Sequence, residues 1–282
     1  MQVVSTIAEL RVRLSSEHAV AFVPTMGNLH EGHLNLMKLA RKHGNCVVAS
    51  IFVNPLQFGP GEDFDRYPRT LDADCAMLRD FVDIVFAPPV DEMYPVQQTV
   101  FVELPPVAGE LCGAARPGHF RGMATVVLKL LNIVQPQVAL FGKKDYQQLH
   151  IIRQMVAQLN LPVCIVGGET MRAADGLALS SRNQYLSATE RSEAIFLYQM
   201  LQGMRLDILQ GEHNFERLCQ QAVEVLAARG WMPDYVAVRN QSDLKPANIV
   251  QDNLARRELV ILAAARLGNT RLLDNIEVCL AD

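Results

Sequence analysis

The segment Pro24–His33 contains the side chains best suited to chemistry, since two histidines, His30 and His33, stand three residues apart beside glycines. Positions three apart share one face of a helix. Gly27 and Gly32 would let the backbone approach a phosphate closely, and a helix N-terminus offers free N–H groups and a partial positive charge to an anion. The pattern therefore indicates a phosphate-binding segment in which two imidazoles donate to oxygens whose negative charge grows in a transition state.

Two alternative roles of the histidine pair remain open. His30 could cap a helix while His33 packs at the surface, which is the more common role of an isolated pair. A zinc site is a second alternative, but no third ligand with suitable spacing accompanies the two imidazoles. The pair directly follows an apolar run that resembles a strand, and doubly wound sheets bind ligands outside the carboxyl ends of their strands. That position favours phosphate binding.

A second candidate segment, Ser50–Pro60, follows the next apolar run along the chain. Its amides, Asn54 and Gln57, can each donate and accept hydrogen bonds, which suits a small polyhydroxy acid better than a bare charge. Taken alone, the Asn-Pro pair at its start favours an ordinary turn.

A third segment, Gly142–Gln148, again lies where a strand-like run ends and a helical pattern begins. A lysine at this place could reach phosphates, a carboxylate could accept a ribose hydroxyl, and Gln148 would face inward one turn later. The alternative is a solvated loop in which Asp145 caps the helix.

The fourth segment, Asp175–Asn183, combines hydroxyls and a cation in Ser180–Arg182. Two hydroxyls beside a guanidinium can hold a polyphosphate through charge-assisted hydrogen bonds, and a glycine-containing loop is a common place for a lid. A plain interdomain loop is the alternative. Arg116 and Arg121 add two further cations, which a solvated turn would explain equally well.

Short apolar runs that alternate with helical patterns must position these segments. Strand, helix and strand within about 35 residues form a βαβ unit, which implies a parallel sheet and a right-handed crossover. Buried parallel strands should be continuous apolar runs, as these are. The predicted strands are 19–23, 46–53, 84–86, 138–141 and 163–166; the predicted helices are 34–44, with Gly44 as C-terminal cap, 71–81, 125–134 and 146–159. The fold class is therefore α/β, a Rossmann-like doubly wound parallel sheet.

The alternation stops after about residue 170. Ser187–Glu190 has the form of a capping box and predicts a helix toward Met204, and a second helix is predicted over 215–228. Strand-like runs follow at 235–238 and 259–262. Helices followed by strands indicate a smaller α+β domain, so we divide the chain into a Rossmann-like domain, 1–172, and a C-terminal domain, 173–282.

The composition excludes several classes of protein. The chain has 282 residues with a net charge of −4 and no basic block, which argues against nucleic acid or an anionic membrane surface as its partner. No apolar run approaches the ~20 residues needed to cross a bilayer, and no secretory signal is visible. Six cysteines without a C-x-x-C pair fit free thiols in a reducing compartment. We therefore expect a cytoplasmic protein.

Five motifs together identify a family. They are Pro-Thr-Met-Gly-x-Leu-His-x-Gly-His from Pro24, Phe-Val-Asn-Pro-x-Gln-Phe from Phe52, Arg-Pro-Gly-His-Phe from Arg116, Lys-Asp-Tyr-Gln-Gln-Leu from Lys144 and Asp-Gly-Leu-Ala-x-Ser-Ser-Arg-Asn from Asp175. In order and approximate spacing they resemble the pantothenate synthetase (pantoate–β-alanine ligase) family of the nucleotidyltransferase superfamily. The resemblance runs from about residue 20 to residue 186, and 270–275 is similar to the family's ending.

The resemblance implies a homodimer that joins pantoate and β-alanine with ATP, giving pantothenate, AMP and diphosphate. In the first step the pantoate carboxylate attacks the α-phosphate and diphosphate leaves. In the second the β-alanine amine attacks the pantoyl adenylate and AMP leaves. Mg²⁺ is expected with ATP, held largely by phosphate oxygens and water, and no metal held by protein side chains is implied. The C-terminal domain would act as a lid.

The resemblance also implies which residues form the site. His33, His30 and Lys144 would be catalytic, Gln57 would bind pantoate and β-alanine, and Gln148 would bind pantoate. The ATP-binding residues would be Met26, Gly27, Asn28, Leu29, His30, Glu31, Gly32, His33, Gly142, Lys143, Lys144, Asp145, Met171, Leu179, Ser180, Ser181 and Arg182.

Within this set, His33 corresponds to the residue that the family usually uses as a proton donor. Diphosphate is already a good leaving group, so stabilising charge is the larger task for His30 and His33. The chain departs from the family pattern at Lys143, where glutamate is common. The Lys143 side chain neighbours the site without matching a named role of its own, so the change concerns the local electrostatics rather than the chemistry.

Two rival functions share parts of this pattern. A nucleotidyltransferase of the same superfamily would need the histidine segment but not the pair Gln57 and Gln148. A non-catalytic nucleotide- or RNA-binding module should have lost His30, His33, Lys144 or the Ser180–Arg182 cluster. All of these residues are present, which favours the ligase.

Overall fold

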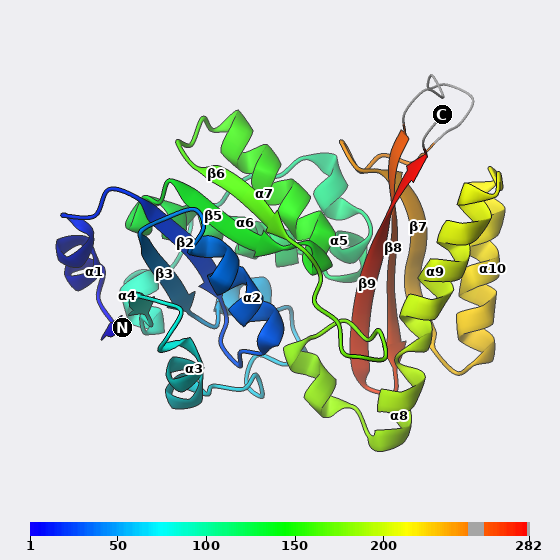
Figure 1. Ribbon diagram of the computed structural model, residues 1–282, viewed down its shortest axis with the longest axis horizontal. Helices are drawn as coiled ribbons and strands as arrows, with labels where there is room; N and C mark the ends of the chain where they lie inside the picture. The colour runs from blue at the N-terminus through cyan, green and yellow to red at the C-terminus, as the bar shows by residue number, and fades with distance from the viewer. Residues whose placement is uncertain (248–256, 281–282) are drawn as a thin grey trace.

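A computed structural model describes residues 1–247 and 257–280, in which two β-sheets organise the chain (Figure 1). The first sheet has the order β1-β4-β3-β2-β5-β6, and all of its neighbouring strands are parallel. Its strands are β1 (Gln2–Val4), β2 (Val20–Thr25), β3 (Cys46–Ile51), β4 (Ile84–Phe86), β5 (Val138–Gly142) and β6 (Cys164–Gly168). The fold class predicted from the sequence, a doubly wound parallel α/β sheet, is confirmed.

Helices cover both faces of this sheet because its strands are apolar on both faces. Phe22 and Val48 point into one core with α6 and α7, whereas Val23 and Ala49 point into the opposite core under α2 and α3. The helices of this part are α1 (Ile7–Leu14), α2 (Glu31–Ala40), α3 (Leu71–Leu78), α4 (Val90–Met93), α5 (Cys112–Ala115), α6 (His119–Val134) and α7 (Tyr146–Gln158).

The second sheet is antiparallel, in the order β7-β8-β9, and lies on the other side of the molecule in Figure 1. Successive residues of β8 face opposite sides: Ile261 packs under α9 and α10, and Leu262 packs toward Tyr146 of the first part. This sheet therefore joins the two parts of the molecule. Its elements are α8 (Ala188–Glu193), α9 (Phe196–Leu209), α10 (Phe215–Ala228), β7 (Met232–Asn240), β8 (Arg257–Leu267) and β9 (Thr270–Leu280).

The sheet order places the candidate segments together. β2 lies between β3 and β5, so the chain turns to opposite sides of β2 as it forms these two neighbours. Ligands bind outside the carboxyl ends of strands at such a switch point. The segments that follow β2, β3 and β5 are the first three segments singled out in the sequence.

Several elements differ from the predictions. Gly44 does not cap α2, which ends at Ala40; a Cβ at Gly44 would lie 2.6 Å from the Ala19 carbonyl oxygen, so glycine is needed there for close approach to β2. The predicted helix from Ser187 toward Met204 is two helices, because the chain turns at Ala194, which is fully buried in the second core. Short β1 and polar β9 were not predicted.

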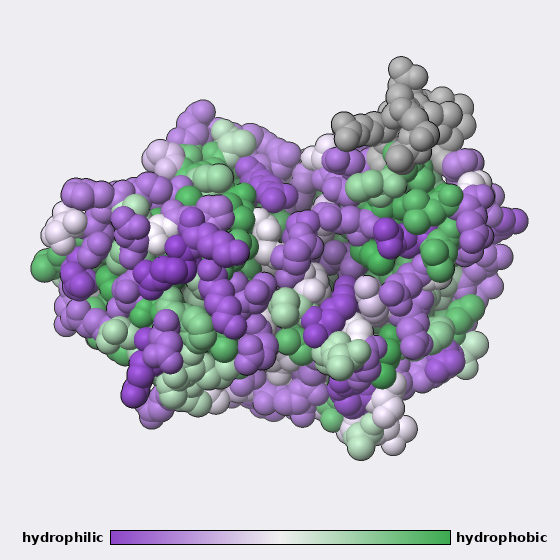
Figure 2. All heavy atoms as spheres, viewed as in Figure 1, coloured by the Kyte–Doolittle hydropathy of each residue, from purple (hydrophilic) through white to green (hydrophobic). Residues whose placement is uncertain are grey.

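The face of the molecule shown in Figure 2 is mainly hydrophilic, with apolar residues in separate groups. The exposed large apolar side chains come from different elements, such as Val12 in α1, Val100 in a loop and Met232 in β7. Within residues 1–247 and 257–280, no helix is long and apolar enough to span a bilayer. Dispersed apolar residues of this kind are normal on protein surfaces.

Gly122 in α6 allows the loop after β3 to pack against this helix, since a Cβ there would lie 1.9 Å from the Leu56 carbonyl oxygen and 2.7 Å from the Gln57 nitrogen. We expect Gly122→Ala to lower the free energy of unfolding by about 1–3 kcal/mol or more, because backbone must move. The matched control, Gly203→Ala in α9, places its methyl group in open space and should stabilise the protein by about 0.5–1 kcal/mol. Urea unfolding measures both; equal stability of the two variants would contradict this packing.

Candidate active site

A cavity of about 230 Å³ lies at the carboxyl ends of β2, β3 and β5. Residues from all four candidate segments line it. Of the predicted site residues, the lining includes Met26, His30, Gly32, His33, Gln57, Gly142, Lys144, Asp145, Gln148, Met171, Leu179, Ser180, Ser181 and Arg182. Gly27, Asn28, Leu29, Glu31 and Lys143 are not among the lining residues.

The loop between β2 and α2 has an unusual backbone that one carboxylate stabilises. Gly27 and Asn28 have φ of 81° and 50°, so two successive residues are left-handed. Asp74, which is 1% exposed, accepts hydrogen bonds from the N–H groups of Asn28 (3.0 Å) and Leu29 (2.8 Å). Thr70 donates a third bond to the same carboxylate at 3.1 Å. Gly27, Asn28 and Leu29 thus shape the loop that carries the histidines.

His30 and His33 use one ring nitrogen each to cap the start of α2. Nδ1 of His30 accepts from the Gly32 N–H at 3.1 Å, and Nδ1 of His33 accepts from the His30 N–H at 3.3 Å. An accepting Nδ1 places the proton of a neutral imidazole on Nε2. The capping role proposed as an alternative is therefore present, and it leaves each Nε2–H free to donate.

Burial keeps both imidazoles neutral. It lowers the pKa of His33 to about 3, assisted by His30 and the Lys144 ammonium. Burial and Lys144 likewise lower the pKa of His30 to about 4. The two rings lie 4.1 Å apart between centroids, a separation at which two positive charges would repel strongly. At neutral pH the pair therefore presents two uncharged donors.

The two amides after β3 have different roles. Asn54 is 1% exposed, and its side chain forms hydrogen bonds within the protein. Its Nδ2 donates to Gln57 Oε1 and to the Gly122 carbonyl, and its Oδ1 accepts from the Tyr94 hydroxyl. Among the residues that the structure describes, the Gln57 Nε2 group faces only the weakly accepting sulfur of Met26, at 2.9 Å. Asn54 therefore orients Gln57, whose NH₂ group is available to a ligand.

The adjacent glutamines of α7 divide in the same way. Gln147 is buried, donating to the Val107 and Glu110 carbonyls and accepting from the Cys112 N–H. Gln148 lines the cavity, and its amide makes no hydrogen bond within the described parts of the chain. Only the second glutamine can serve a ligand.

The segment after β5 is attached to the second sheet. Nδ2 of Asn275 donates to the carbonyls of Lys143 (3.0 Å) and Lys144 (2.8 Å). The Lys143 ammonium lies between Glu169 (2.7 Å) and Glu277 (3.0 Å). Lys144 stays in the cavity, with Asp145 at 3.6 Å. The side chain of Lys143 therefore contributes to the junction between the sheets, while ATP binding by Lys143 stays a prediction.

The Ser180–Arg182 segment joins the cavity from the opposite side. The Ser181 hydroxyl donates to the Asn28 carbonyl at 2.9 Å, which links this segment to the histidine loop. Arg182 donates to both carboxylate oxygens of Asp63, at 3.1 and 3.0 Å. Its guanidinium is thus oriented within the cavity by a carboxylate that a phosphate could replace.

Arg116 and His119 belong to the cavity but were absent from the predicted set. Arg116 is paired with Glu62 at 2.6 Å and approaches Nε2 of His119 at 3.1 Å. Nδ1 of His119 lies 2.8 Å from the Gln57 carbonyl, and burial lowers the pKa of His119 to about 4. The motif beginning at Arg116 was the available signal. Arg121 instead lies over the Phe101 ring, outside the cavity lining.

Metal ligation by the protein was not predicted. In the described ranges, no group of three or more histidine, cysteine, aspartate or glutamate side chains could hold an ion. The buried carboxylate nearest the histidine loop, Asp74, already accepts three hydrogen bonds.

Comparisons with known proteins find relatives that match nearly the whole chain. A sequence model described as pantoate-beta-alanine ligase matches residues 2–277. A pantothenate synthetase from Nitrosospira multiformis is 57% identical over 279 residues, covering 99% of this chain and 98% of that protein. The crystal structure of pantothenate synthetase from Thermus thermophilus has 48% identity and a TM-score of 0.91, covering 98% of this chain and 99% of that one.

A further solved structure is the pantoate-beta-alanine ligase of Francisella tularensis, complexed with beta-gamma ATP and beta-alanine. It is 34% identical to this chain, with a TM-score of 0.80, and the alignment covers 98% of this chain and 97% of that one. Both alignments cover nearly the whole chain and therefore include both sheets. On these grounds the chain belongs to the pantoate–β-alanine ligase family.

Proposed function

We propose that the cavity at the ends of β2, β3 and β5 is the active site, and that it catalyses the ATP-dependent condensation of pantoate with β-alanine. The observation that carries this proposal is the arrangement of two groups of side chains around one space. Two neutral imidazoles and the cations Lys144 and Arg182 suit a polyphosphate, and the free amides of Gln57 and Gln148 suit a hydroxy acid. The ATP and β-alanine complex of the Francisella relative supports the same assignment.

In the first step a carboxylate oxygen of pantoate attacks the α-phosphorus of ATP. The bond from this phosphorus to the α,β-bridging oxygen breaks, and diphosphate leaves with the electron pair. Negative charge develops on the phosphate oxygens, where Nε2–H of His30 and His33 and the Lys144 ammonium can stabilise it. These donors are fixed before the reaction, so little reorganisation is required.

In the second step the β-alanine amine attacks the carbonyl carbon of the pantoyl adenylate, and AMP leaves as the amide forms. The bond between the carbonyl carbon and the phosphate oxygen breaks, AMP keeps its electron pair, and the proton that the amine nitrogen loses passes to solvent water. An acyl adenylate must be protected from water until the amine arrives. One wall of the cavity is apolar and suits the branched carbon skeleton of pantoate; it includes Met123, Val126, Val127 and Leu130 of α6 and Phe141 of β5.

The remaining assignments extend this proposal. ATP would contact the segments Met26–His33 and Gly142–Asp145, the backbone at Met171 and the residues Leu179–Arg182. The C-terminal domain, 173–282, would act as a lid on the ATP- and pantoate-binding domain, 1–172. Mg²⁺ would accompany ATP and neutralise part of its charge.

The cellular context is also proposed. All six cysteines are free thiols, as a reducing compartment requires, which supports the cytoplasm. The partners would be the substrates pantoate, β-alanine and ATP, with no role for nucleic acid or a membrane. The homodimer rests on the resemblance to the family.

Pantoate-dependent exchange of labelled diphosphate into ATP, with β-alanine left out, tests the function directly. We expect exchange only when pantoate is present, because the adenylate forms reversibly before the amine binds. Formation of AMP only after β-alanine is added, without exchange, would contradict a separate first step. Absence of AMP under both conditions would favour a nucleotidyltransferase or a silent nucleotide-binding module.

The neutral tautomers predict how replacements of His33 behave. His33→Ala should lower kcat by roughly 10²–10³-fold, as for other preorganised donors. His33→Gln should retain more activity than His33→Ala, because its amide NH₂ group can replace Nε2–H. Steady-state kinetics measures both, with His43→Ala, an exposed histidine outside the cavity, as control. An acid role would leave the two His33 variants equally slow.

The pH dependence adds a second readout. Since the pKa values of His33 and His30 in the free enzyme are about 3 and about 4, these rings stay neutral as the pH falls from 8 to 5. The kcat/KM for ATP should show no loss from their protonation in this range. A loss centred near pH 6.5 that disappears in His33→Gln would contradict neutral donors.

Gln57 is expected to act mainly in substrate binding. Gln57→Ala removes an amide that faces the cavity, so it should raise the KM for pantoate about fivefold to thirtyfold, as expected for a lost hydrogen bond of about 1–2 kcal/mol. The KM for ATP should change little. Gln158→Ala, at an exposed position of α7, is the control. An unchanged KM for pantoate would remove Gln57 from the pantoate site.

A further inference from the structure

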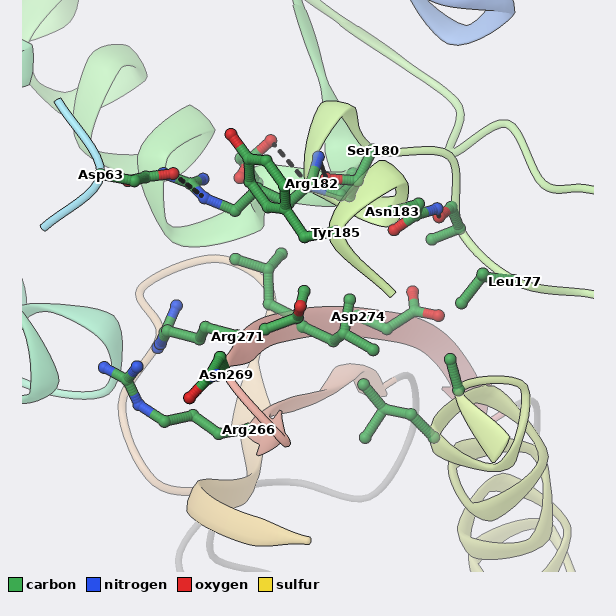
Figure 3. A pocket seen from close by; sticks show the side chains of 18 of the residues that line it. Asp63, Leu177, Ser180, Arg182, Asn183, Tyr185, Arg266, Asn269, Arg271 and Asp274 are labelled. Carbon is green, nitrogen blue, oxygen red and sulfur yellow. Dashed lines mark hydrogen bonds and ion pairs between the residues drawn. The ribbon is translucent and has the colours of Figure 1, made fainter. Parts of the chain in front are cut away.

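A second cavity of about 460 Å³ adjoins the active site between the two sheets. Figure 3 shows its two walls: Ser180, Arg182 and Asn183 lie across from residues of the β8–β9 hairpin. The two cavities have five lining residues in common, namely Arg116, Lys144, Asp145, Ser180 and Arg182. The space is therefore continuous with the proposed phosphate site.

Most charged groups of this second cavity are already paired. The pairs are Arg116 with Glu62 (2.6 Å), Arg182 with Asp63 (3.0 Å), Lys144 with Asp145 (3.6 Å), Arg271 with Asp234 (2.6 Å) and Asp274 with Arg172 (2.6 Å). Each of these pairs is neutral as a whole. The remaining charges decide the sign of the potential.

Two further arginines line the second cavity, Arg66 from the first part of the chain and Arg266 from the second sheet. Arg66 follows the loop that carries Glu62 and Asp63, and Arg266 lies near the end of β8. Neither has an ion-pair partner among the residues that the structure describes, and both are exposed. The cavity thus has a surplus of two positive charges, which attracts an anion.

We propose that the second cavity receives the diphosphate released in the first step, with Arg66 and Arg266 as its added ligands. This inference rests on the proposed function. After the bond between the α-phosphorus and the bridging oxygen breaks, diphosphate must separate from the adenylate so that the amine can reach the carbonyl carbon. Arg182 borders both cavities, so its guanidinium can stay in contact with phosphate oxygens while the anion moves.

The double variant Arg66→Ala/Arg266→Ala tests this assignment, with Arg205→Ala on the exposed face of α9 as the charge-matched control for one arginine. Calorimetry measures binding of diphosphate in the presence of Mg²⁺, and kinetics gives its inhibition constant and the KM for ATP. We expect diphosphate to bind about threefold to tenfold more weakly to the double variant, as for two exposed ion pairs. The KM for ATP should change less than twofold.

The outcomes separate this inference from the proposed function. Pantoate-dependent exchange tests the function, whereas calorimetry reports diphosphate binding without turnover. If the KM for ATP rises in parallel with the inhibition constant, the two arginines contact ATP itself and the separate diphosphate site is wrong. If diphosphate binding equals that of wild type and Arg205→Ala, the cavity has no such role. Weakening that disappears at high salt supports the charge surplus as its cause.

Discussion

The hydrogen bonds that Asp74 accepts support the catalytic end of the sheet. A left-handed backbone at Gly27 and Asn28 turns the chain sharply after β2, and a Cβ at Gly27 would come within 3.0 Å of the Asp74 carboxylate. Ionic acceptors bind backbone N–H groups strongly in a buried place, so the turn is held in one form. The direction of α2 and the positions of both imidazoles depend on it.

The same loop connects distant parts of the chain. Ser181 reaches it from the segment before α8, and Asp74 reaches it from α3. On the other side of the cavity, Asn275 of β9 donates hydrogen bonds to the carbonyls of Lys143 and Lys144. The proposed reaction thus takes place between the carboxyl ends of inner strands and residues whose backbone the second sheet orients. Binding groups and orienting groups alternate along the chain, as Asn54 and Gln57 or Gln147 and Gln148 show.

Much of the fold could be predicted because burial leaves a clear pattern. The inner strands are apolar on both faces, and α10 was predicted with its observed bounds, 215–228. β9 was missed because polar residues interrupt its apolar pattern. These residues contact the first part of the chain; they are Asp274, Asn275 and Glu277. The place of Arg116 and His119 in the cavity was not predicted. Their partners, Glu62 and Gln57, lie more than fifty residues away in the sequence. No local spacing reports such a contact.

The ion pairs of Lys143 have a consequence for how members of this family diverge. The family pattern commonly has glutamate at this position, which here would bring a third carboxylate to Glu169 and Glu277 and leave them without their cation. Residue 143 directly follows β5 of the first sheet, residue 277 lies in β9 of the second, and in this chain their charges are opposite. A chimera that joins the first part of a relative with glutamate at this position to the second part of this chain would place that carboxylate beside Glu277 and remove the cation that now neutralises it.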